Sequence, residues 1–217
     1  MDFENNYKTK KSVIKELEKI FEEYKSYLYD EFKITNIMDY KNILLASTLN
    51  RSLALIEAYK KLLYSNNIMV LNSLTRLQLD NCIFVHGIHL LAKDGHDIDE
   101  LGSAIIQENK KLSTYKIGKQ KLYDFYLISE IDKKYKNNIK EMYDFYCRFI
   151  HFSDSALFSS SQVLNDNILS VGCSKDYSRF KKHIIPNANS FTNLCRFLLI
   201  LIKKEWKDIP NGKKMNK

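Results

Sequence analysis

The residues best suited to chemistry lie in the stretch CRFIHFSDS, residues 147–155. Arg148 and His151 are three positions apart, so a helix places both side chains on one face. Histidine exchanges protons near neutral pH, and arginine can hold a phosphate and stabilise developing negative charge. With Tyr143 and Ser153 as substrate contacts, Arg148 and His151 could together act as the catalytic groups of a metal-independent ribonuclease. The alternative is the capped end of a packed helix, because His complements a helix dipole and Ser caps the next element.

A second candidate is Arg76, at the centre of NSLTRLQLDNCIF. Asp80 follows it by four positions, so the two side chains can pair on one helix face. A buried arginine needs a partner, because leaving its charge bare costs several kcal/mol. The partner could be Asp80 or a substrate phosphate, and in the second case Arg76 could share a site with His151. Both interpretations stay open at this point.

Metal and cofactor sites receive little support from the sequence. Cys82, His86 and His89 are spaced so that two of them could share a zinc ion. Three ligands from one straight helix rarely complete a tetrahedron, however, and a buried cysteine commonly packs as a small apolar side chain. The chain also has no Gly-rich phosphate loop, no H-E-x-x-H and no G-x-S-x-G. We therefore expect no metal and no cofactor.

Composition indicates an all-α fold. The chain has 217 residues, of which 45% are hydrophobic, so it can bury a sizeable core. With only 6 Gly and 2 Pro, it has few of the turn-forming residues that the many tight turns of an all-β fold need. We predict a single helical bundle of about five to six helices over residues 1–206, followed by a disordered basic tail at 207–217. A short strand or irregular segment is expected near 168–173.

Apolar periodicity places the helices. The third helix is apolar on nearly every side, so it should be the central one. Gly95 can take the left-handed conformation that ends it, and Asp97 can cap the helix that follows. Residues 110–121 are polar and read as a loop. The expected helices span about 13–28, 39–64, 68–93, 97–109, 129–152 and 187–206.

Charge and cysteine usage bear on partners and location. The formal net charge is +8, and much of it lies in the last fifteen residues, so a polyanion such as RNA is a candidate partner. The four cysteines are widely scattered, which indicates reduced thiols and a cytoplasmic protein. The most hydrophobic stretch, LCRFLLILI, has only nine residues and contains Arg196. It is too short to span a bilayer, so no membrane association is expected.

Two segments carry a resemblance to known families. LNSLTRLQLDNCIFVHGI and MYDFYCRFIHFS together resemble an uncharacterised bacterial helical family of unknown function, over roughly residues 43–155. More distantly, the chain resembles the HEPN superfamily, whose active members are RNases with an Arg and a His on one helix, often in toxin and antiphage systems. This resemblance implies a catalytic role for Arg148 and His151.

Three functional hypotheses follow. The first is a bacterial toxin or antiphage-defence protein that binds or cleaves RNA through Arg148 and His151, with Arg76 as a phosphate clamp. The second is a non-enzymatic interaction module that forms a homodimer or binds another protein. The third is a sensor that binds a small anionic ligand between helices.

Overall fold

The computed structural model describes residues 6–35, 39–150, 161–165, 168–171 and 181–210. Within these ranges it contains seven α-helices, and the only strands belong to two small hairpins. The all-α prediction is therefore confirmed. The helices are α1 (Lys10–Thr35), α2 (Tyr40–Leu63), α3 (Ile68–Lys93), α4 (Ile98–Gln107), α5 (Asp124–Tyr135), α6 (Ile139–Ile150) and α8 (Lys181–Lys204).

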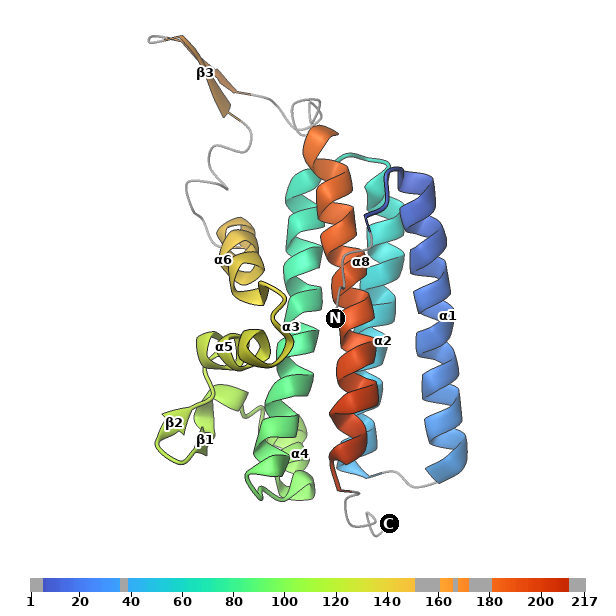
Figure 1. Ribbon diagram of the computed structural model, residues 1–217, viewed down its shortest axis with the longest axis vertical. Helices are drawn as coiled ribbons and strands as arrows, with labels where there is room; N and C mark the ends of the chain where they lie inside the picture. Colours follow the sequence, from blue (N-terminus) through green and yellow to red (C-terminus); the bar gives the residue numbers. More distant parts are fainter. Residues whose placement is uncertain (1–5, 36–38, 151–160, 166–167, 172–180, 211–217) are drawn as a thin grey trace.

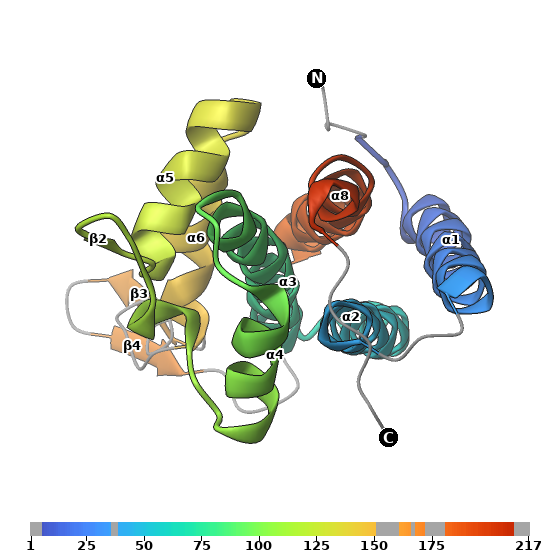
Figure 2. The same ribbon diagram turned by 90° about the horizontal axis from the view of Figure 1, so that it is seen from below.

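Four long helices, α1, α2, α3 and α8, stand side by side as an upright bundle (Figure 1). Helix α3 contacts α2, α5, α6 and α8, which makes it the central helix that its apolar sequence predicts. Seen from below, α1 and the α5–α6 pair lie on opposite sides of the bundle (Figure 2). Helix α4 packs against α2. Within the described residues, no helix is both long enough and apolar enough to cross a membrane.

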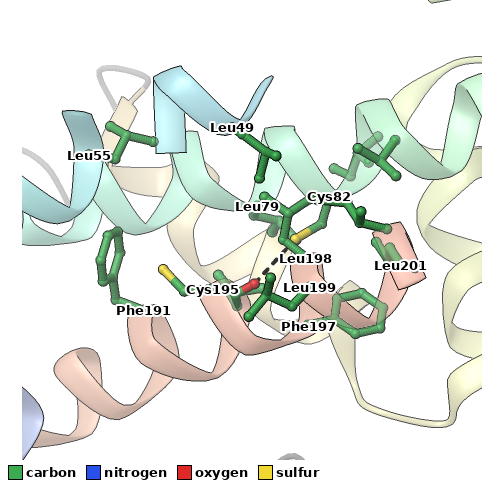
Figure 3. Close-up of a cluster of buried hydrophobic side chains, with 14 of the residues drawn as sticks. Leu49, Leu55, Leu79, Cys82, Phe191, Cys195, Phe197, Leu198, Leu199 and Leu201 are labelled. Carbon is green, nitrogen blue, oxygen red and sulfur yellow. Dashed lines mark hydrogen bonds between the residues drawn. The ribbon is translucent and has the colours of Figure 1, made fainter. Parts of the chain in front are cut away.

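The interior between α2, α3 and α8 is apolar and closely packed (Figure 3). Phe191 on α8 stacks on Tyr59 of α2, with ring centroids 3.9 Å apart and planes 10° apart. Cys82 on α3 is fully buried and donates its thiol to the carbonyl of Leu194 at 3.5 Å (Figure 3). Both cysteines of this core, Cys82 and Cys195, are free thiols. Burial raises the pKa of each, so both behave as small apolar side chains.

Local signals at the end of α3 act as the sequence predicts. Gly95 adopts φ +91° just after the Asp94 C-cap. The Asp97 carboxylate then accepts hydrogen bonds from the backbone N–H groups of Asp99 and Glu100 and caps α4. The Asp97 carboxylate thus satisfies two backbone N–H groups that the start of a helix leaves unpaired. The turn between α3 and α4 is thus set by sequence-local chemistry.

The helix expected at about 129–152 is wrong in its extent. The structure has two helices there, α5 and α6, separated by a turn in which Lys136 and Asn138 both have φ 54°. An L-residue in this conformation cannot continue a right-handed helix. The Asp132 carboxylate accepts from the backbone N–H groups of Ile139 and Lys140 at 2.7 and 2.9 Å and so caps α6 from the preceding helix.

Two hairpins interrupt the helical pattern. The first pairs β1 (Lys116–Ile117) with β2 (Gln120–Lys121) and turns at Gly118, within the expected loop. The second pairs β3 (Ser161–Asn165) with β4 (Ile168–Val171) in antiparallel register. Strand β4 confirms the short strand expected near residue 168.

The last helix and the tail also differ from their expected bounds. Helix α8 begins at Lys181 rather than near residue 187, and Pro186 lies inside it. After α8, a 3₁₀ turn at Trp206–Asp208 leads into Ile209, which is buried. The Nζ of Lys41 donates to the carbonyl of Ile209. The described structure therefore continues to residue 210, and Ile209, which we expected in the tail, is buried.

Candidate functional site

Arg76 lies at the junction of three helices. Its guanidinium pairs with Asp80 on α3, and Nη2 lies 3.5 Å from Oδ2 of Asp124 on α5. From α6, the Tyr143 ring lies 4.2 Å from Cζ of Arg76, and Sγ of Cys147 accepts from Nε at 3.2 Å. The side chain is only 8% exposed. The predicted Arg76–Asp80 pair is therefore confirmed, and these contacts hold α5 and α6 against α3.

Tyr143 belongs to the same cluster. Its hydroxyl donates to Oδ2 of Asp124 at 3.1 Å. Burial and the neighbouring Asp124 carboxylate raise the pKa of Tyr143 to about 12, so the hydroxyl stays protonated as a donor at neutral pH. Arg76 and Tyr143, both candidate substrate contacts, thus lie together, but their polar groups face protein partners.

The catalytic pair predicted from CRFIHFSDS is only partly visible. Arg148 is exposed in the last turn of α6. His151 and Ser153 lie outside the described residues. The convergence of Arg148 with His151, and of Arg76 with His151, therefore stays a prediction.

A groove opens next to the Arg76 cluster, beside Arg51, and we name it the Arg51 groove. It has a volume of about 710 Å³, which is in the range of small-molecule sites. Its floor and walls come from α2, α3, α4, α5 and the turn before β1. The lining residues are Leu44, Ser47, Thr48, Arg51, Asp80, Asn81, Ile83, Phe84, Ile105, Ile106, Lys111, Leu112 and Asp124.

Arg51 is held in place by a buried amide. Its Nη1 donates to Oδ1 of Asn81 at 2.6 Å. Asn81 is 1% exposed, and its Nδ2 donates to Ser52 at 2.7 Å and to Gln78 at 3.2 Å. The amide oxygen therefore has a fixed orientation toward the guanidinium. Arg51 is positioned without any neutralisation of its charge.

The charge of Arg51 is uncompensated within the part of the chain that the structure describes. No described carboxylate lies at salt-bridge distance from it, whereas Arg76 has Asp80 and Asp124, and Arg196 has Glu16 and Glu23. Partial removal from water lowers the pKa of Arg51, and the nearby Arg76 charge lowers it further. Both effects disfavour the cation in the free protein, so an incoming anion relieves them.

The Arg51 groove carries charge of both signs on a mainly apolar surface. Lys111 is a second cation on its wall, while Asp80 and Asp124 are already engaged by Arg76. Side chains such as Phe84 and Ile105 supply the apolar part of the lining. Two cations and two carboxylates line the groove, but neither Arg51 nor Lys111 has a carboxylate partner among the described residues. The remaining surface suits a hydrocarbon or aromatic group.

The histidines of α3 serve a different purpose from metal binding. Nδ1 of His86 donates to the Glu205 carboxylate at 2.9 Å, and Nδ1 of His89 lies 3.1 Å from the Glu205 carbonyl oxygen. Cys82 points to the backbone of α8 instead. Among the described residues, no group of three or more His, Cys, Asp or Glu side chains is placed to hold a metal ion.

Glu205 is the charged residue that sequence patterns missed. It is 0% exposed and receives hydrogen bonds from His86, from Lys134 at 2.7 Å and from Tyr135 at 2.8 Å. Burial alone raises the pKa of this carboxyl, but its partners together lower it to about 2. Glu205 therefore ties the end of α8 to α3 and α5 as a buried anion.

The fold and the groove define a helical-bundle protein with a largely apolar cleft beside its central helix, on whose wall Arg51 has no carboxylate partner among the described residues. Comparisons of the chain with models of known protein families, with curated proteins and with solved structures find no match. The resemblances noted in the sequence therefore remain predictions.

Proposed function

We propose that the protein binds a small molecule with an anionic group and an apolar body in the Arg51 groove. The observation that carries this proposal is the guanidinium of Arg51, which a buried amide fixes at the wall of the groove without a neutralising carboxylate. It corresponds to the third hypothesis from the sequence, a sensor of a small anion between helices.

The chemistry of the lining indicates how such a ligand is recognised. The planar guanidinium of Arg51 can donate two parallel hydrogen bonds to a phosphate or carboxylate, and Lys111 adds a second positive charge. The apolar part of the ligand would then contact Phe84 and the side chains of α4. Because Asn81 already orients Arg51, little side-chain entropy is lost on binding.

Arg51→Gln is expected to raise the dissociation constant for phenyl phosphate about tenfold, the equivalent of about 1.4 kcal/mol. Phenyl phosphate is chosen as a probe because it combines a dianion with a flat apolar ring. The substitution keeps a long polar side chain but removes the charge and the paired donors. Isothermal titration calorimetry on wild type and variant measures the difference directly.

Lys61→Gln is the matched control, because it removes one positive charge from an exposed position of the same helix outside the groove. It should leave the affinity for phenyl phosphate unchanged. Equal weakening by both substitutions would mean that the probe senses only the net charge, and unchanged binding by Arg51→Gln would refute the proposal.

The hypothesis that the protein is a ribonuclease is tested separately, by an RNA degradation assay. RNA degradation by the purified protein is compared with that by Arg148→Ala and His151→Ala, and the thermal unfolding of each variant is recorded. Cleavage that is lost in folded variants would support a catalytic pair. RNA binding that weakens steeply with salt would favour a polyanion partner, and a stable dimer indifferent to RNA would favour the interaction module.

A further inference from the structure

A second, chemically different cavity lies near the N-terminal end of α3 and is lined by residues of α3, α6 and α8. It has a volume of about 480 Å³. Its walls are mainly apolar and aromatic. The described lining residues are Ile68, Asn72, Glu141, Met142, Phe145, Tyr146, Phe149, His183, Pro186, Asn187 and Ser190.

A buried network of amides and hydroxyls forms the polar part of this cavity. The Tyr59 hydroxyl donates to Oδ1 of Asn187. Nδ2 of Asn187 donates in turn to Oδ1 of Asn72 at 2.7 Å and to the hydroxyl of Thr75 at 3.2 Å. Each hydrogen bond fixes the orientation of the next amide. The direction of donation therefore runs from Tyr59 to Asn72.

The network ends at a donor that lacks an acceptor. Asn72 is 2% exposed, and its Oδ1 is used by Asn187, so its two amide hydrogens remain. Among the described residues, Nδ2 of Asn72 has no hydrogen-bond acceptor, and Asn72 lines the cavity. This nitrogen is open to the cavity rather than sealed from it, so an acceptor atom of a ligand there can take its hydrogen bond.

The rest of the lining selects against anions. Phe145 and Tyr146 pack edge to face with centroids 5.0 Å apart, and the Phe145 and Phe149 centroids are 5.3 Å apart. These rings offer flat apolar surface rather than ion partners. Glu141 is the acidic residue among those that line the cavity, and its carboxylate repels anions. The ligand class differs from the one suited to the Arg51 groove.

We infer that this cavity binds a flat, largely apolar molecule without an anionic group, whose carbonyl or other acceptor oxygen takes the hydrogen bond offered by Asn72. The site stands independently of the Arg51 groove, because the two share no lining residue.

The test uses Nile red, a neutral and flat dye with a carbonyl acceptor, titrated into the full-length protein and followed by its fluorescence. Wild type should bind one dye molecule with a blue-shifted emission. Ser190→Trp, which fills the cavity with an indole, should abolish this binding. Asn72→Leu, which keeps the side-chain size but removes the donor, should weaken it about fivefold, the equivalent of about 1 kcal/mol.

Ser26→Trp is the control for the added indole, because Ser26 is exposed on α1 away from the cavity. It should bind the dye as wild type does. Thermal unfolding of each variant separates lost binding from lost folding. Absence of dye binding by wild type, or equal binding by wild type and a folded Ser190→Trp, would overturn the inference.

Discussion

Phe191→Ala is expected to lower the free energy of unfolding by about 4 kcal/mol. The ring is 0% exposed and stacks on Tyr59, whose hydroxyl holds the buried amide of Asn187. Truncation removes buried apolar surface, leaves a cavity between α2 and α8, and deletes an aromatic pair that contributes about 1 kcal/mol beyond its area. Urea unfolding followed by circular dichroism measures the loss.

Phe125→Ala is the matched control for this substitution. Phe125 is 58% exposed on α5, so removing its ring should change the unfolding free energy by less than about 0.5 kcal/mol. Phe191→Leu should lie between the two, because it keeps most of the apolar volume. Similar losses for Phe191→Ala and Phe125→Ala would show that the stacked pair is not part of a close-packed core.

The bounds of α2 and α3 could be predicted from sequence because their signals are local, whereas α1 and α8 extend beyond their expected ranges. Apolar periodicity located α2 and α3 within one or two residues of their ends, and Gly95 and Asp97 marked the turn that follows. The break between α5 and α6 was not predicted from the sequence, although it also has a local signal. Asn138 tolerates the left-handed conformation, and Asp132 is close enough to cap the next helix, but the apolar seam continues through the break and hides it.

The candidate site could be predicted only in part, because its contacts are mostly distant in sequence. The Arg76–Asp80 pair follows from a spacing of four on a helix. By contrast, Asp124 reaches Arg76 across 48 positions, and Asn81 reaches Arg51 across 30. No periodicity encodes such pairings. They arise from how the bundle brings α2 and α5 against α3, so the uncompensated charge of Arg51 becomes evident only in the folded chain.

The contacts of Glu205 are likewise distant in sequence and could not be predicted from it. The second large loss of stability is expected at this residue. Glu205→Gln is expected to lower the free energy of unfolding by about 3 kcal/mol at pH 7. The amide keeps the shape of the side chain, but it removes the charge that Lys134 compensates and that His86 hydrogen-bonds. Lys134 is then left beside a neutral group, and His86 loses its anionic acceptor. Chemical unfolding of wild type and variant gives the difference.

The pH dependence identifies this loss as electrostatic. The pKa of Glu205 is about 2 in the folded protein, against an ordinary value of 4.5 that applies to the unfolded chain. Because the folded pKa is the lower one, the unfolded state takes up a proton first as the pH falls. The stability that Glu205 contributes is therefore complete above pH 4.5 and disappears as the pH approaches 2.

The difference between wild type and Glu205→Gln should accordingly shrink from about 3 kcal/mol at pH 7 toward zero near pH 2. Glu57→Gln is the comparison, because Glu57 forms a partly exposed ion pair with Lys60 on α2, and pairs near the surface contribute about 1 kcal/mol or less. A Glu205→Gln loss that stays constant between pH 7 and pH 2 would mean that packing, not the buried charge, holds the end of α8 to α3 and α5.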